Sequence, residues 1–216
     1  MSKRRIDYSL YLVTDRGLSR GRSTLEIVRA AVRGGVSCVQ LREKTCSTRE
    51  FIEEALKLKA FLDSSGVALI INDRVDVALV VGADGVHLGQ SDMPLAAARS
   101  IVGDSMVIGI SAESLRDAVE AESGGADYLG VSPIFATPTK TDTAAPLGLA
   151  GLQAIRRAVK IPLVGIGGLN RSNAAEVVRS GADGVAVVSA IVAAEDSEQA
   201  ARDLKREIDR ARRAWG

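Results

Sequence analysis

One stretch, FATPTKTDT at residues 135–143, concentrates groups that could bind an anion. It holds four threonines around a single lysine, Lys140, and it overlaps the end of the apolar run DYLGVSPI. Ordinary turns use Gly, Asn, Asp and Pro because these residues solve backbone geometry, and threonine solves little of it. Threonine hydroxyls donate and accept hydrogen bonds, and lysine adds a compact positive charge. The stretch therefore predicts a loop that contacts an anionic ligand.

Two carboxylates, Asp73 and Asp92, follow apolar runs that read as neighbouring strands. Their side chains could share one divalent cation. Mg²⁺ typically binds few protein ligands and takes further ligands from phosphate oxygens. N-capping is equally open, because Asp73 precedes RVDVALVV and Asp92 precedes Met93-Pro94, and both are favourable helix starts. The spacing alone does not decide between metal binding and capping.

Basic residues and glycines stand at other strand ends. Arg42 and Lys44 follow the second predicted strand and, with Lys140, could neutralise an anion, although solvated surface charge is the ordinary alternative. The segments GIGGLN (165–170) and VVSAI (187–191) follow the last two predicted strands. Loops at these positions commonly bind phosphate through backbone N–H groups, with a helix start expected near Ser189. Tight helix–strand packing is the alternative reason for the glycines.

The single histidine, His87, lies inside the predicted strand GVHLG and is expected to be a core residue with satisfied hydrogen bonds. Because this only histidine is read as a core residue, the sequence does not predict a Ser-His-Asp mechanism. Two anion sites and a cation site without an obvious proton-transfer pair point away from hydrolysis. They indicate transfer chemistry with a phosphorylated leaving group.

The elements that would hold these residues form a repeating pattern. Each of four segments places glycine before an apolar run that ends in polar residues: GGVSCVQLRE (34–43), VGADGVHLGQ (81–90), GGADYLGVSP (124–133) and SGADGVAVVS (180–189). Glycine at a helix C-terminus accepts the left-handed backbone conformation. Further apolar runs lie at 10–14, 68–72, 107–111 and 163–167. Near-continuous apolar runs are typical of parallel strands buried on both faces.

The segments between these runs have helical period. Ser47 and Glu50 form a capping box, and residues 170–180 and 195–214 also read as helices. One helix face after the capping box holds Phe51, Ala55, Leu58 and Leu62. Eight strands alternating with helices predict a (β/α)8 TIM barrel, with reactive residues at the carboxyl ends of the strands. A doubly wound sheet is the alternative, and it usually needs fewer strands or a second domain. Without a Pro/Ser-rich linker, residues 1–216 are predicted to be a single domain.

Composition narrows the function further. The 216 residues are 46% hydrophobic and 3% aromatic, with a net charge of +1. Balanced charge and few aromatic rings argue against nucleic acid or a membrane surface as partner. Cys38 and Cys46 lack metal-type spacing, and no segment has the length of a signal peptide or a membrane span. We expect a cytoplasmic protein with small-molecule ligands, and leave a homo-oligomer open.

Seven motifs together resemble the thiamine-phosphate synthase family, in order and from about residue 8 to 191: YLVTDR, VQLREK, LIINDR, GVHLGQSDMP, PIFATPTKTD, GLAGL and LVGIGGLN. The resemblance implies a TIM-barrel transferase of thiamine biosynthesis. Such an enzyme joins hydroxymethylpyrimidine diphosphate to a thiazole phosphate and releases pyrophosphate. With a carboxylated thiazole, carbon dioxide is also lost. The implied cofactor is Mg²⁺.

The resemblance also assigns residues. Contacts to the pyrimidine diphosphate would be Gln40, Leu41, Arg42, Glu43, Lys44, Asn72, Ser111 and Lys140. Contacts to the thiazole phosphate would be Thr137, Pro138, Thr139, Gly168, Val188 and Ser189, and the metal ligands would be Asp73 and Asp92. The catalytic group would be Lys140, Arg42, Lys44 and Ser111, with the cations stabilising charge on the departing diphosphate. A dissociative step followed by attack of the thiazole nitrogen needs no base, which would explain the missing acid–base pair.

Two positions depart from the family pattern. Glu113 occupies a place after the fifth strand where many relatives have histidine, and Ser132 replaces a common glycine.

Three other functions stay open. A thiazole tautomerase is the first alternative, and we expect it to depend on the histidine that Glu113 replaces. The second is a non-catalytic barrel that binds thiamine precursors. A sugar-phosphate isomerase or aldolase is the third, and it would need an acid–base pair or a Schiff-base lysine within a strand.

Overall fold

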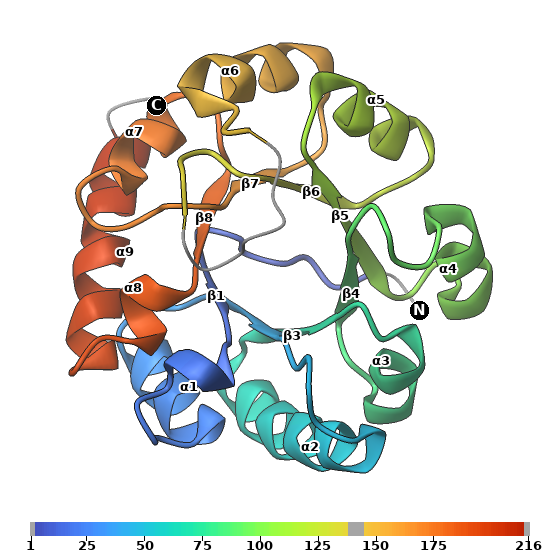
Figure 1. Ribbon diagram of the computed structural model, residues 1–216, viewed down its shortest axis with the longest axis vertical. Helices are drawn as coiled ribbons and strands as arrows, with labels where there is room; N and C mark the ends of the chain where they lie inside the picture. Colours follow the sequence, from blue (N-terminus) through green and yellow to red (C-terminus); the bar gives the residue numbers. More distant parts are fainter. Residues whose placement is uncertain (1–2, 138–144, 214–216) are drawn as a thin grey trace.

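A closed barrel of eight parallel strands forms the centre of the molecule, with helices around it (Figure 1). We describe residues 3–137 and 145–213 of a computed structural model. Each strand pairs with the next along the chain, and the last pairs with the first, which confirms the predicted TIM barrel. The strands are β1 Leu10–Val13, β2 Cys38–Leu41, β3 Ala68–Asn72, β4 Gly85–Leu88, β5 Val107–Ala112, β6 Tyr128–Val131, β7 Leu163–Gly165 and β8 Gly184–Val187.

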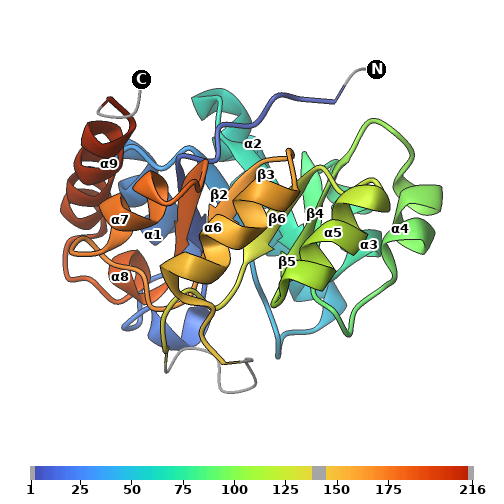
Figure 2. The same ribbon diagram turned by 90° about the horizontal axis from the view of Figure 1, so that it is seen from above.

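Helices alternate with the strands and cover the outside of the barrel (Figures 1 and 2). In the described ranges, none of them combines the length and the hydropathy that a membrane crossing requires. The helices are η1 Arg16–Leu18 (a 3-10 turn), α1 Thr24–Arg33, α2 Thr48–Ser65, α3 Val75–Val81, α4 Leu95–Val102, α5 Leu115–Ser123, α6 Gly148–Ala158, α7 Ala174–Arg179, α8 Ser189–Val192 and α9 Ser197–Arg213.

The predicted capping box begins α2. The Ser47 hydroxyl accepts a hydrogen bond from the Glu50 N–H, and the Glu50 carboxylate accepts one from the Ser47 N–H. The predicted helix face is buried and consists of Phe51, Ala55, Leu58 and Leu62. A second capping box, at Ser23 and Glu26, begins α1. These caps satisfy N–H groups that the first helical turn would otherwise leave without partners.

The four repeated segments end their preceding helices with a left-handed glycine, as predicted. Gly35, Gly82, Gly125 and Gly181 have φ angles of 102°, 62°, 89° and 105°. A side chain at such an angle is strained, so glycine is the residue that lets each helix turn back into a strand.

Residues of each strand alternate between two apolar layers. In β1, Leu10 and Leu12 belong to the layer between the barrel and the helices, whereas Tyr11 and Val13 belong to the layer inside the barrel. All three tyrosines of the chain, Tyr8, Tyr11 and Tyr128, lie in the inner layer. The tyrosines are therefore concentrated inside the barrel, whereas Phe51 belongs to the outer layer.

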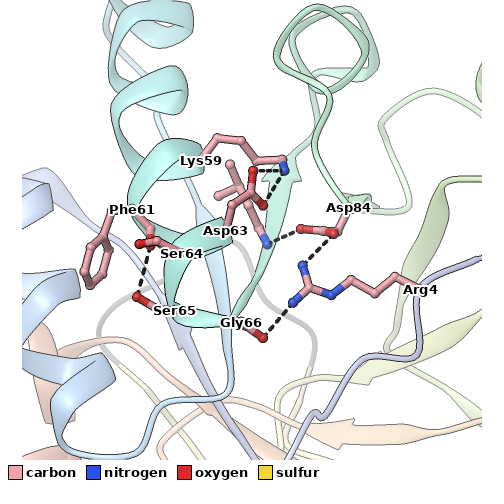
Figure 3. A network of polar contacts seen from close by, with 9 residues as sticks. Arg4, Lys59, Phe61, Asp63, Ser64, Ser65, Gly66 and Asp84 are labelled. Carbon is pink, nitrogen blue, oxygen red and sulfur yellow. Dashed lines mark hydrogen bonds and ion pairs between the residues drawn. The ribbon is translucent and has the colours of Figure 1, made fainter.

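The N-terminal segment crosses the end of the barrel at which the strands begin (Figure 2). Arg4 donates to Asp84 at 2.9 Å and to the Gly66 carbonyl at 2.6 Å, and Asp84 also accepts from the Leu69 N–H (Figure 3). These bonds tie residues before β1, β3 and β4 together. The opposite end of the barrel, where the strands finish, is left for a site.

Candidate active site

A cavity of about 490 Å³ lies among the carboxyl ends of the strands. Its wall contains residues from several strands, as expected for this end of a TIM barrel. Of the predicted site residues, the cavity wall includes Gln40, Arg42, Asn72, Ser111, Thr137, Gly168, Val188 and Ser189. It also includes residues that were not predicted as ligand contacts, among them Tyr11, Asp15, His87 and Tyr128.

Three predicted residues, Pro138, Thr139 and Lys140, lie outside the described residues. In the FATPTKTDT stretch, residues 135–137 are described, and Thr137 lies in the cavity wall. Ser132, one of the two departures from the family, also lies in the cavity wall and precedes Pro133 through a cis peptide bond. The other departure, Glu113, follows β5, and its N–H donates to Asp117.

Arg42 is held at the cavity by two contacts from the first βα loop. Its guanidinium Nη1 lies 3.2 Å from Asp15 Oδ2, and its backbone N–H donates to Thr14 Oγ1 at 3.0 Å. Asp15 is fixed in turn because its carboxylate accepts from the Leu18 N–H and caps η1. The guanidinium is therefore oriented, and the Arg42 side chain is still 27% exposed. It retains N–H donors for an anion in the cavity.

Lys44, Asp73 and Asp92 form a charged cluster beside the cavity. Lys44 Nζ lies 2.5 Å from Asp73 Oδ2, and Asp92 accepts from the Gly89 N–H at 2.7 Å. The pKa of Asp92 is raised, first by burial and then by its contact with Asp73, so the two carboxyl groups are close neighbours. Two adjacent carboxylates are hard oxygen donors that could hold one Mg²⁺. In the part of the chain that the structure describes, no group of three His, Cys, Asp or Glu side chains could hold a metal, so other ligands would come from substrate or water.

The capping alternative for the two carboxylates is wrong. Arg74 is the N-cap of α3 and Pro94 is the N-cap of α4, and neither makes a side-chain cap hydrogen bond. Asp73 instead adopts a φ of 60° just after β3. This uncommon conformation for a non-glycine residue belongs to the turn that brings its carboxylate to Lys44.

Two predicted pyrimidine diphosphate contacts have side chains that face elsewhere. Leu41 is fully buried in the layer between the barrel and the helices. The Glu43 carboxylate is 3% exposed and lies 3.3 Å from Arg16. Burial, followed by the nearby Glu54, raises the pKa of Glu43. For both residues, contact with a ligand would have to come from backbone atoms.

The glycines after β7 serve close packing. Gly168 has a φ of 66°, and a Cβ there would lie 2.6 Å from the Ala136 carbonyl oxygen. A Cβ at Gly167 would lie 2.8 Å from Pro133 Cα. The packing alternative is therefore supported, although the partner is the loop after β6 and not a helix. Within the described residues, the N–H groups of Gly168 and Ser189 have no backbone acceptor, and α8 begins at Ser189 as predicted.

His87 lies in a line of hydrogen bonds that sequence reasoning missed. Gln40 Nε2 donates to the Tyr11 hydroxyl, and the Tyr11 and Tyr128 hydroxyls are also hydrogen-bonded, both at 2.9 Å. His87 Nδ1 lies 2.9 Å from the Tyr128 hydroxyl, and His87 Nε2 lies 3.0 Å from Ser111 Oγ. We call these five residues the polar line. The hydrogen bonds of His87 are satisfied, as predicted, but the ring is half-buried in the cavity wall and not in the core.

The strand pattern contains a signal for the polar line. Alternation places Tyr11 and Gln40 on the inner face of neighbouring strands, because Tyr11 is in register with Cys38, two residues before Gln40. Glycines at inner positions of β5 and β6 leave space for large neighbours. A Cβ at Gly109 would collide with the Tyr128 ring, and one at Gly130 would lie 2.9 Å from His87 Cε1.

Comparisons with known proteins agree with these features. The model of the family described as thiamine monophosphate synthase matches residues 10–191. A thiamine-phosphate synthase of Chloroflexus aurantiacus is 60% identical over 200 residues, which cover 93% of this chain and 92% of the relative. A thiamine-phosphate synthase of Syntrophomonas wolfei is 56% identical, with 92% and 95% covered.

Solved structures agree as well. The thiamine phosphate pyrophosphorylase from Pyrococcus furiosus superposes with a TM-score of 0.89 at 42% identity, covering 95% of this chain and 97% of its own. A 3-hexulose-6-phosphate synthase, at 18% identity and a TM-score of 0.65, shares the fold alone. The extent of the family match and the identity to these relatives establish that the chain belongs to the thiamine monophosphate synthase family.

Proposed function

We propose that this chain is a thiamine-phosphate synthase, a transferase of thiamine biosynthesis. It transfers the hydroxymethylpyrimidine group from its diphosphate to the nitrogen of a thiazole phosphate, and it releases pyrophosphate. The observation that carries the proposal is the cavity of about 490 Å³, with an oriented arginine in its wall and a lysine–carboxylate cluster beside it. A cavity of this size is in the range for small-molecule sites.

The diphosphate end of the pyrimidine substrate is assigned to the side of the cavity that carries Arg42 and Lys44. A guanidinium held by Asp15 offers a planar fork of N–H donors, which suits phosphate oxygens. Lys44 adds a second positive charge, and Lys140 would add a third from outside the described residues. Ser111 supplies a hydroxyl to the diphosphate. Gln40 and Asn72 supply amides to the pyrimidine ring. Leu41 and Glu43 would contribute backbone atoms.

The Mg²⁺ of this proposal is held by Asp73 and Asp92. The support is their proximity: after burial, contact with Asp73 is the next cause that raises the pKa of Asp92. Bound there, Mg²⁺ would supply positive charge that stabilises the departing diphosphate. Lys44 forms an ion pair with Asp73, so the lysine keeps that carboxylate in place and limits the repulsion between the two carboxyl groups.

The thiazole phosphate is assigned to the part of the wall that follows β7 and β8, at Gly168, Val188 and Ser189. The support is that the N–H groups of Gly168 and Ser189 are left without backbone acceptors in the described part of the chain. Oriented N–H groups of this kind bind phosphate oxygens. Thr137 lies in the same wall, and Thr139 with Pro138 would extend this contact beyond it.

The reaction then depends on charge stabilisation and on positioning. The cations oppose the negative charge that grows on the leaving diphosphate, and the aminopyrimidine spreads the positive charge left on its methylene carbon. The thiazole nitrogen attacks with its own lone pair, so no general base is required. Anchoring the thiazole by its phosphate would hold that nitrogen in line with the carbon.

A direct assay separates the transferase from a barrel that only binds thiamine precursors. The purified protein is incubated with both substrates, with and without Mg²⁺, and released pyrophosphate is measured. We expect continuous release that needs all three components. Tight binding of both substrates without release would support the binding protein and contradict the transferase. The cytoplasmic location and any self-association belong to the same proposal, and cell fractionation and light scattering would test them.

A further inference from the structure

The polar line joins two residues that the proposed function assigns to different parts of the pyrimidine diphosphate. Ser111 stands at one end and Gln40 at the other, on β5 and β2. Tyr11, Tyr128 and His87 connect them through four hydrogen bonds of 2.9 to 3.0 Å. The connection crosses the inside of the barrel, where Tyr11 and Tyr128 are 1% and 0% exposed. Solvent is therefore excluded from the middle of the line.

Each connecting residue has one hydrogen to donate along the line. A tyrosine hydroxyl has a single O–H, and a neutral imidazole has one N–H and one accepting nitrogen. Burial raises the pKa of both tyrosines well above the usual value, so both hydroxyls stay protonated. If one member donates towards Gln40, the next must do the same, because a reversed neighbour would place two hydrogens, or two lone pairs, against each other. The line therefore has two proton orders, one in each direction.

The Cys38 thiol competes only weakly for the Tyr11 hydroxyl. The Cys38 thiol lies close to Tyr11, and burial raises the pKa of Cys38 well above its usual value. A neutral thiol is a weak donor and a weak acceptor, so it does not replace the Tyr128 hydroxyl as the partner of Tyr11. The rings are also held in position. Gly109 and Gly130 leave the space that Tyr128 and His87 occupy, and a Cβ at either glycine would contact these rings.

We propose that the polar line couples the two ends of the pyrimidine site. Binding of a diphosphate at Ser111 fixes the orientation of the Gln40 amide, and this orientation selects a pyrimidine that carries an amino group. A diphosphate oxygen only accepts hydrogen bonds, so the Ser111 hydroxyl must donate to it. Ser111 Oγ then accepts from His87 Nε2–H, and His87 Nδ1 accepts from Tyr128.

The same order continues to the other end of the polar line. Tyr128 accepts from Tyr11, and Tyr11 accepts from the Gln40 amide nitrogen. This is the amide orientation that the structure shows. The Gln40 amide oxygen is then left to face a ligand as an acceptor, and its natural partner is an N–H donor such as an exocyclic amine. A pyrimidine with a carbonyl oxygen at that position would meet oxygen against oxygen. Tyr11, Tyr128 and His87 are thus positioning residues for specificity.

The test compares binding of two pyrimidine diphosphate analogues, one with the amino group and one with an oxo group in its place. A CH₂ group replaces the oxygen that links each pyrimidine to its diphosphate, so neither can react. Calorimetry gives a Kd for each with wild type, Tyr128→Phe and Tyr11→Phe. We expect wild type to favour the amino analogue by about tenfold or more, since a buried polar group would otherwise be unpaired. In either variant we expect the ratio to fall to about threefold or less, because the Gln40 amide is free to turn.

The matched control is Tyr8→Phe. Tyr8 lies in the same inner layer, with its ring 4.6 Å from that of Tyr128, and its hydroxyl is not part of the polar line. We expect its ratio to equal that of wild type. Equal ratios in wild type, Tyr128→Phe and Tyr11→Phe would overturn the coupling while leaving the proposed function intact. The proposal rests on that function, so absence of wild-type turnover with the natural substrates would overturn both.

A spectroscopic measurement reads the proton order directly. The chain has one histidine, so ¹⁵N-histidine labelling gives signals from His87 alone. With inorganic pyrophosphate and Mg²⁺ bound, we expect the neutral tautomer protonated at Nε2. In Tyr128→Phe, which removes the donor to Nδ1, we expect the share of that tautomer to fall. A ring protonated at Nδ1 alone, or at both nitrogens, in the wild-type complex would overturn the proposal.

Discussion

Arg42 and Lys44 are two residues apart, yet their side chains serve different partners. Arg42 is oriented by Asp15 in the cavity wall, whereas Lys44 pairs with Asp73 in the carboxylate cluster. The separation follows from their places after β2, where the chain leaves the barrel and successive side chains diverge. At the scale of single residues, the structure therefore separates Arg42, which we propose for diphosphate recognition, from Lys44, which also supports a proposed metal ligand.

Replacing Arg42 by lysine tests the role of the guanidinium. The change keeps the positive charge but loses the planar fork that can hold Asp15 and a phosphate at once. We expect KM for the pyrimidine diphosphate to rise by about tenfold, with a smaller change in KM for the thiazole phosphate. Steady-state kinetics measure both. Arg49→Lys, an exposed arginine in α2, is the control, and equal kinetics in both variants would contradict the assignment.

Replacing Asp73 or Asp92 by asparagine tests the metal site. Each change removes a carboxylate from the pair while keeping its size. We expect the Mg²⁺ concentration for half-maximal rate to rise at least about tenfold. A titration with Mg²⁺ after treatment with a chelator measures it. Asp104→Asn, at an exposed position between α4 and β5, should leave the titration unchanged. An unchanged titration in Asp73→Asn and Asp92→Asn would exclude these residues as ligands.

At the scale of elements, the loops after β6 and β7 fit together through glycine. Gly167 and Gly168 have positive φ angles and admit the loop at Pro133 to Ala136, which overlaps the start of the FATPTKTDT stretch. The Ile134 and Phe135 N–H groups donate to the carbonyls of Ile166 and Gly167. A change at Gly168 would therefore disturb both loops at once.

Alanine at Gly168 tests this packing. The Cβ would lie 2.6 Å from the Ala136 carbonyl oxygen, so the loop must shift. Gly66→Ala is a matched control, because Gly66 has a φ of 71° with no atom within 4 Å of the Cβ position. Both variants carry the left-handed strain of about 1 kcal/mol, seen as a lower stability in urea unfolding. We expect only Gly168→Ala to raise KM for the thiazole phosphate, by about tenfold. The same KM in both variants would contradict the role of this loop contact.

The capping box of α2 offers a prediction on stability alone. Ser47→Ala removes the acceptor for the Glu50 N–H, and we expect a loss of about 1 kcal/mol in the free energy of unfolding. Urea denaturation measures it. Ser100→Ala removes an exposed hydroxyl that bonds back to the Ala97 carbonyl within α4, and it should be nearly neutral. Equal effects of the two substitutions would show that the cap contributes nothing specific.

Much of the element order could be predicted because parallel barrel strands are buried on both faces. The runs at 68–72 and 107–111 correspond to β3 and β5, Ala68–Asn72 and Val107–Ala112. The run at 163–167 was too long, since β7 ends at Gly165 before the positive φ angles of Gly167 and Gly168. The helix at 170–180 also begins later, at Ala174, because Asn170 and Asn173 form a turn with backbone and side-chain bonds.

Predicting the site was harder, because side-chain direction depends on closure of the barrel. Polar residues at strand ends marked the correct end, and Arg42, Asn72 and Ser111 do line one cavity. The alternation of the strand directs Leu41 outwards, while Arg16 draws Glu43 away. The contacts of the polar line join residues as far as 117 positions apart, between Tyr11 and Tyr128. No local pattern contains such a pairing.

At the scale of the whole molecule, the two ends of the barrel have different tasks. The end at which the strands begin is closed by the N-terminal segment, with Arg4 bonded to Asp84 and Gly66 (Figure 3). The other end carries the cavity, the cations and the carboxylate pair. This division lets the chemistry occupy loops that are held by a rigid barrel.

The most direct measurement is the stoichiometry of products from the purified protein. Thiamine phosphate is quantified by mass spectrometry and pyrophosphate by a coupled assay in the same reaction. The account predicts that both form in a ratio of about one to one, only when pyrimidine diphosphate, thiazole phosphate and Mg²⁺ are all present. Release of pyrophosphate without thiamine phosphate, or no product under these conditions, would contradict it.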